Sequence, residues 1–167
     1  MTFRNDEISD IDKIMNIIKQ AQEYLKEKGV DQWQDNYPNF DVIKDDIEKR
    51  KSYVLETDGK VVATVAVSYN DEKTYEKIYD GNWITESDYA VIHRIAVDNK
   101  YKGKRLSSII LSEIEKMCLY KNIHSIKVDT HKQNESMKKM LSNNGFKYCG
   151  IIYLENGKER VAYEKII

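Results

Sequence analysis

The chain has 167 residues, a length that suits one domain, and we expect a single domain over residues 1–167. Its 27 lysines and arginines balance 28 aspartates and glutamates, which argues against general electrostatic binding of nucleic acid. No apolar run approaches the ~20 residues of a membrane span, and the polar start does not resemble a signal peptide. We therefore expect no membrane contact and a cytoplasmic location.

The first part of the chain shows helical spacing. Apolar residues recur over residues 8–28 in the pattern of an amphipathic helix, and a short strand is expected before them, near Phe3. A second, shorter helix is predicted from about residue 41 to 50. The charged run at 44–51 is interpreted as a solvated helix face.

The pattern then changes to that of β-strands. Residues 52–55 and 61–67 are rich in β-branched residues, and the Asp-Gly pair at 58–59 between them predicts a hairpin. Residues 70–88 show no clear period, so we expect a long loop. Residues 89–97 are predicted to form another strand.

The rest of the chain alternates between the two patterns. A helix is predicted after Gly103, a strand over 125–128 and a short helix over 135–144. A second hairpin is predicted from residues 151–154 and 160–163, around an Asn-Gly pair.

These elements define a fold class. The strand–helix–strand unit from residue 89 to 128 needs a right-handed crossover and a parallel pair, whereas the hairpins need antiparallel pairs. We predict a mixed α/β (α+β) fold with one mixed, mostly antiparallel sheet of about six to seven strands and helices on both faces. The isolated Cys118 and Cys149 are expected to be buried thiols, without a metal site.

A basic turn follows the strand at 89–97 and precedes a helix. The free N–H groups of a helix's first turn, with the helix dipole, attract anions. Lys102, Lys104 and Arg105 add positive charge at this point. The turn therefore favours a phosphate or pyrophosphate; the alternative is a solvated basic helix start.

This turn resembles the acyl-CoA binding motif of the GNAT superfamily of N-acyltransferases, Q/R-x-x-G-x-G/A. Lys102 takes the place of Gln/Arg, Arg105 of glycine and Ser107 of Gly/Ala. Downstream, Asn134 opens a helix that ends in Gly-Phe at 145–146, which resembles the second signature of the family. The predicted order of elements also matches the family, and Asp-Gln-Trp-Gln at 31–34 with Tyr-Pro at 37–38 is typical of one bacterial branch.

The resemblance implies acetyl-CoA as cosubstrate. Backbone groups of the strand would polarise the thioester and bind pantetheine, the turn would hold the pyrophosphate, and the Asn before the last helix would contact the CoA arm. That Asn also suits an N-cap. The implied cofactor-binding residues are Ile95, Ala96, Val97, Lys102, Gly103, Lys104, Arg105, Leu106, Ser107 and Asn134.

Arg105 departs from the motif. We expect it in the first turn of the helix with a right-handed backbone, which needs no glycine. Its guanidinium is then available to pair with a CoA phosphate.

The catalytic residues are less clearly indicated. His93 lies where the family often has the group that takes the amine's proton, and a histidine titrates near neutrality; the alternative is a buried core histidine. His131 is the rival base. Many family members have a tyrosine acid at the position of Leu141, so Tyr148 becomes the candidate acid, with Tyr153 as the next in sequence.

Trp33, Gln34 and Tyr37 are predicted to bind the acceptor, because aromatic and amide groups in a loop suit a small polar molecule. The alternative is a loop held together by its own aromatic residues. The function predicted is transfer of an acetyl group from acetyl-CoA to a primary amine, on a small molecule, by direct attack. A catalytically inactive CoA-binding module and a protein or peptide N-acetyltransferase remain open, and the family's frequent dimers make a homodimer a candidate.

Overall fold

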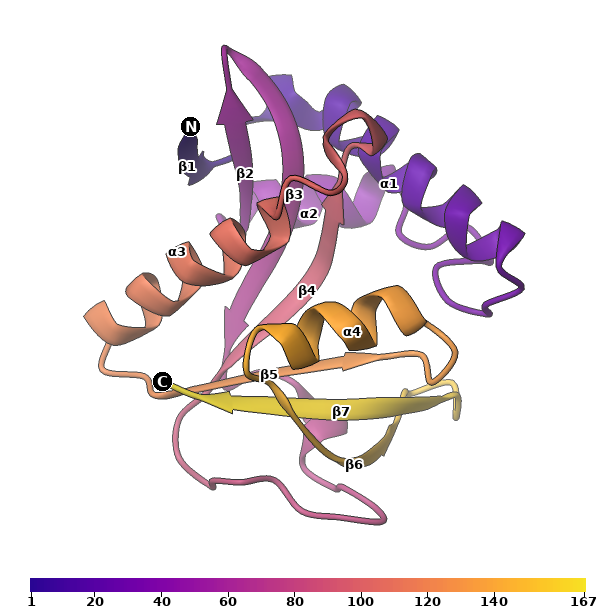
Figure 1. Cartoon of the computed structure of the whole chain (residues 1–167), viewed down its shortest axis with the longest axis vertical. Helices are drawn as coiled ribbons and strands as arrows, with labels where there is room; N and C mark the ends of the chain where they lie inside the picture. Colours follow the sequence, from indigo (N-terminus) through magenta and orange to yellow (C-terminus); the bar gives the residue numbers. More distant parts are fainter. The chain divides into compact units, whose positions relative to one another are not determined.

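The computed structural model describes residues 1–167, and its strands form one seven-stranded sheet in the order β1-β2-β3-β4-β5-β7-β6 (Figure 1). The pair β4–β5 is parallel, whereas β1–β2, β2–β3, β5–β7 and β6–β7 are antiparallel, which confirms the predicted mixed, mostly antiparallel sheet. The elements are β1 (Thr2–Asn5), α1 (Ile11–Glu27), α2 (Phe40–Glu48), β2 (Ser52–Thr57), β3 (Lys60–Tyr69), β4 (Ala90–Val97), α3 (Leu106–Tyr120), β5 (Ser125–Thr130), α4 (Glu135–Asn143), β6 (Lys147–Tyr153) and β7 (Glu159–Ile166).

The chain divides into two compact units. The first consists of residues 1–67 and 93–113, and the second of residues 68–92 and 114–167. Each is described by itself below. A single domain over the whole chain stays a prediction. No helix is both long and apolar enough to span a membrane.

In the first unit, α1 supplies the core through the stripe that the sequence predicted. Ile14, Ile17 and Ile18 are fully buried and pack with Val54 of β2. Burying each such side chain contributes about 1.5–3 kcal/mol. The hairpin β2–β3 turns at 58–59, where both residues have positive φ, as the Asp-Gly pair predicted.

The structure of helix α2 differs from one prediction made from the sequence. The charged run at 44–51 is not a uniformly solvated face, because Asp46 is only 6% exposed. Residues three and four apart share one face of a helix, so Asp46 lies on the side of the buried Ile43 and Ile47. The helix begins at Asn39, whose side chain accepts a hydrogen bond from the Val42 N–H at 3.0 Å.

In the second unit, residues 70–88 form a long loop between β3 and β4, as predicted, and this loop is well anchored. Tyr75, in a single 3₁₀ turn, is 3% exposed and donates a hydrogen bond to Asp129 of β5 at 2.7 Å. Tyr79 forms an isolated antiparallel bridge with Ile151 of β6. Both cysteines are free and buried, as predicted, and burial raises the pKa of Cys118 to about 11.

Candidate active site

Strand β4 carries the predicted base and the residues implied to hold the thioester. Ala96 is buried, while Ile95 and Val97 are half-buried. Arg94 has a φ of 52°, a left-handed backbone that costs a side-chain-bearing residue about 1–2 kcal/mol. His93 lies half-buried directly before this irregularity. Strained backbone clusters at functional sites, which makes this part of β4 a candidate for the reaction site.

The turn after β4 is braced by α1. Lys13 of α1 pairs with the buried Asp98, and the Gln20 side chain accepts from the Asn99 N–H at 2.7 Å. Lys102 places its Nζ 4.5 Å from the centre of the Tyr24 ring. Burial alone would raise the pKa of Asp98, but Lys13 and the backbone N–H of residue 100 hold it below its ordinary value. The turn is therefore fixed before any ligand binds.

The backbone of Arg105 differs from the expectation. Helix α3 begins at Leu106, so Arg105 lies before the helix rather than in its first turn, and its φ is 58°. This is the conformation that glycine adopts most easily, which gives a physical reason for the glycine in the family motif. Gly103 is also left-handed, with a φ of 81°. The arginine thus holds a strained position.

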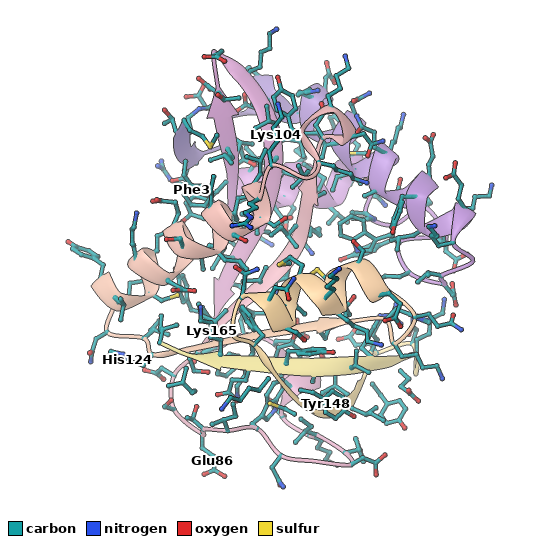
Figure 2. The ribbon with its side chains drawn as sticks, in the orientation of Figure 1. Phe3, Glu86, Lys104, His124, Tyr148 and Lys165 are labelled. Carbon is teal, nitrogen blue, oxygen red and sulfur yellow. The ribbon has the colours of Figure 1, made fainter.

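The turn fits a pyrophosphate. Lys102, Lys104 and Arg105 are exposed, and the helix that follows begins with N–H groups that have no partner within the helix. Lys104, labelled in Figure 2, holds its Nζ 5.0 Å from the centre of the Tyr101 ring. Leu106 is buried and anchors the helix start, and Ser107 is half-buried. The three cationic side chains and the free N–H groups at the start of α3 therefore lie on one short segment.

A second polar cluster lies at the irregularity in β4. The Arg94 guanidinium donates through Nε and Nη2 to the two carboxylate oxygens of Asp46, at 2.7 Å each. Its Nη1 donates to the Tyr37 hydroxyl at 3.0 Å. Burial alone would lower the pKa of Arg94, but Tyr37 and Asp46 outweigh it and raise the pKa above its ordinary value. The guanidinium is a permanent cation with a fixed orientation.

The segment at 31–38 is held mainly by contacts with Gln22 of α1 and with the apolar core. Gln34 donates through Nε2 to the carbonyl oxygens of Gln22 and Gln32, at 3.1 Å each. Gln22 donates in turn to the carbonyls of Tyr37 and Pro38. Trp33 packs against the apolar core of the first unit. Acceptor binding by Trp33, Gln34 and Tyr37 stays a prediction, but only Tyr37 presents its side chain, which is 43% exposed.

The second unit holds the other predicted site residues. Asn134 caps α4 by accepting from the Met137 N–H at 3.1 Å, and its contact with a CoA arm stays a prediction. Tyr148, labelled on β6 in Figure 2, is 53% exposed, with its ring edge-on to Tyr163. Its role as an acid, like that of Tyr153, is a prediction. His131 accepts through Nδ1 from the Gln133 N–H at 3.0 Å.

The potential metal-binding side chains of the protein form no candidate metal site. No group of three or more histidine, cysteine, aspartate or glutamate side chains lies close enough together to hold a metal ion. Leu141, at the position where the family often has its tyrosine acid, is fully buried in the second unit.

The fold is a mixed α/β fold with a basic turn between β4 and α3, and comparison with known proteins gives its family. The profile of the acetyltransferase (GNAT) family matches residues 12–146. The chain therefore belongs to the GNAT family of acetyltransferases. This confirms the resemblance drawn from the motifs at 102–107 and 134–146.

Solved structures of similar proteins have the same fold. A solved GNAT-family acetyltransferase from Streptococcus agalactiae 2603 is 33% identical, with a TM-score of 0.91 over 99% of this chain and 95% of that one. A PaiA N-acetyltransferase from Thermoplasma acidophilum, solved in complex with coenzyme A, shares the fold at 15% identity, with a TM-score of 0.72 over 99% of this chain and 98% of that one.

A curated relative matches part of the chain. An S-alkylcysteine N-acetyltransferase from Bacillus subtilis (strain 168) is 22% identical over 120 residues, which span 70% of this chain and 60% of that enzyme. The chain thus matches less than two thirds of that relative's length.

Sequence reasoning missed the pair of Arg94 and Asp46. A signal was present for each partner. Arg94 interrupts the apolar strand at 91–97, and a charge on such a strand needs a buried partner. Asp46 stands next to Ile47 and three residues after Ile43, on the apolar side of its helix. Nothing in the sequence, however, indicated that these two residues meet.

Proposed function

We propose that the protein transfers an acetyl group from acetyl-CoA to a primary amine of a small molecule. The observation that carries this proposal is the basic turn at 102–105, which leads from β4 into α3 within the first unit. Family membership supports the same reaction class. A cytoplasmic location, expected from the sequence, belongs to this proposal.

In the proposed reaction, acetyl-CoA supplies an activated acyl group as a thioester. The amine nitrogen forms a bond to the thioester carbonyl carbon, the carbon–sulfur bond breaks, and the sulfur leaves as the thiolate of CoA, which then takes a proton from solvent. His93 receives the proton that the amine loses, directly or through water. Backbone N–H groups at 95–97 polarise the carbonyl, and Lys102, Lys104 and Arg105 bind the pyrophosphate.

A small acceptor is supported by the curated relative, which acts on S-alkylcysteine. It is also supported by the segment at 31–38, which Gln22 of α1 holds in place and from which Tyr37 presents a hydroxyl.

The experiment is a steady-state assay that follows the release of CoA thiol with a panel of small amines. Lys104→Ala is expected to raise the KM for acetyl-CoA about ten-fold, because it removes a charge-assisted contact to phosphate. Lys44→Ala, the same change on the exposed face of α2, serves as control. A KM that is equal in both variants would contradict the assignment of the turn.

A second candidate is a CoA-binding protein without catalysis. The buried Leu141, where the family often has its acid, and the strained Arg105 favour it. Binding of acetyl-CoA without acetyl transfer or hydrolysis, across the whole amine panel, would select this candidate instead.

A further inference from the structure

The guanidinium of Arg94 is held in place, but only some of its N–H donors have partners. An arginine offers five N–H donors, and three of them donate to Asp46 and Tyr37. Asp46 takes the side formed by Nε and Nη2, and Tyr37 takes one hydrogen of Nη1, so one N–H donor remains on each of the two nitrogens at the end of the guanidinium, Nη1 and Nη2. This end has the spacing that binds the two oxygens of a carboxylate.

The Tyr37 hydroxyl adds a third donor. Because its oxygen accepts from Arg94, its own hydrogen is directed to another acceptor. Tyr37 is 43% exposed as a residue, whereas the Arg94 side chain is 15% exposed. The hydroxyl oxygen lies 3.0 Å from Nη1, so a ligand that contacts the hydroxyl lies next to the end of the guanidinium.

Holding Arg94 and Asp46 in this arrangement lowers the free energy of unfolding. Arg94 keeps a left-handed backbone within a strand, and Asp46 is buried to fix its side chain. Such strain persists only where surrounding contacts enforce it, and it is typical of ligand-binding positions. Arg94 also directly precedes Ile95, the first of the residues proposed to hold the thioester.

We propose that Arg94 and Tyr37 bind a carboxylate of the acceptor, so that the acceptor class is a small amine that also carries a carboxylate, such as an amino acid. This inference rests on the proposed function. Asp46 balances the charge of Arg94, so recognition depends on the paired hydrogen bonds to a planar carboxylate rather than on long-range attraction. Polyamines, which lack a carboxylate, are poor acceptors.

The test compares matched acceptors: amino acids and the amines that differ from them only by the missing carboxylate. We expect kcat/KM to be at least about ten-fold higher for the amino acids, the effect of hydrogen bonds to a charged group. Tyr37→Phe is expected to lower it about ten-fold for the amino acids and less than about two-fold for the amines. Tyr120→Phe, at a side chain that is 93% exposed, is the control.

Equal kcat/KM for both acceptor sets, or an equal effect of Tyr37→Phe on both, would overturn the inference. Calorimetric titration of the same compounds separates it from the proposed function. Tyr37-dependent binding of the amino acids without acetyl transfer to any amine would refute the proposed function and retain the carboxylate site. Absence of both binding and transfer would refute both.

Discussion

Arg94 of the first unit and Lys127 of the second are cations largely shielded from solvent, and they are held in opposite ways. In the first unit, Arg94 is tied to the carboxylate of Asp46 and reaches an exposed hydroxyl. In the second, Lys127 of β5 is 4% exposed, and its Nζ lies 4.4 Å from the centre of the Trp83 ring and 4.2 Å from that of Tyr89.

The difference separates a presented charge from a packed one. Burial lowers the pKa of Lys127, although Glu164 acts in the opposite direction, and the flanking rings come from the loop at 70–88 and the residue before β4. Lys127 thus fastens that loop to the sheet of its unit through cation–π contacts. Arg94 keeps donors for a ligand, and we therefore assign function to the first cation and structure to the second.

The largest expected effect comes from breaking the pair of Arg94 and Asp46. Asp46→Asn leaves a buried guanidinium without its counter-charge and is expected to cost about 3 kcal/mol of unfolding free energy. The neighbouring Asp45→Asn removes an equal charge from an exposed pair with Lys49 and should cost less than about 1 kcal/mol. Urea unfolding of both variants measures this; equal losses would contradict the buried pair.

A glycine in each unit allows a second comparison of stability. A Cβ at Gly81, in the loop of the second unit, would lie 1.9 Å from the carbonyl oxygen of Cys149, so Gly81→Ala must displace backbone. We expect a loss of about 2–3 kcal/mol.

At Gly103, in the basic turn of the first unit, a Cβ would meet nothing within 4 Å. Gly103→Ala therefore incurs only the left-handed backbone cost of about 1–2 kcal/mol. Thermal unfolding should rank the two variants in this order, and the reverse order would show that the loop at 70–88 is not fixed as described.

The third prediction concerns the enclosed lysine. Lys127→Met replaces the cation by an apolar side chain of similar length, which loses the cation–π contacts and removes the desolvation cost of the charge. We expect the unfolding free energy to change by less than about 1 kcal/mol. A loss as large as that of Asp46→Asn would mean that the charge of Lys127 is itself required.

The smallest effect is a pH dependence of opposite sign in the two units. A hydrogen bond from Arg4 lowers the pKa of Asp10 below its ordinary 3.8, so Asp10 stabilises the fold above that pH and loses this effect as the pH falls through its lowered pKa. Burial raises the pKa of Asp129, so its contribution is greatest below pH 3.8 and is lost as the pH rises through its raised pKa.

Asp10→Asn should therefore be most destabilising at neutral pH, and Asp129→Asn most destabilising in acid. Urea unfolding at several pH values between about 3 and 7 measures both slopes. Slopes of the same sign in the two variants would contradict one of the two environments.

The fold could largely be predicted from the sequence, because local patterns specified its elements. The isoleucine stripe of α1 and the Asp-Gly turn at 58–59 both occur in the structure. The basic turn was also found, since its lysines are contiguous along the chain. Its geometry was predicted less well: Arg105 was expected in the first turn of the helix, but α3 begins at Leu106 and Arg105 is left-handed.

The polar cluster at β4 could not be predicted, for a physical reason. Arg94 and Asp46 are 48 residues apart, and only tertiary packing brings them together. The charged run around Asp46 hides the buried residue among solvated ones, such as Lys44 and Glu48, which are 48% and 62% exposed at their side chains. Long-range pairs of this kind leave no periodic signal in a single sequence.

The central claim, that this chain binds acetyl-CoA at the turn between β4 and α3, is tested most directly by thermal unfolding with and without the cosubstrate. A ligand at 100 times its Kd adds about 2.7 kcal/mol, which should raise the Tm of a domain of this size by roughly 5–11 °C. We expect this rise in Tm for the wild-type chain and a smaller rise for Lys104→Ala. An unchanged Tm at millimolar acetyl-CoA would contradict it.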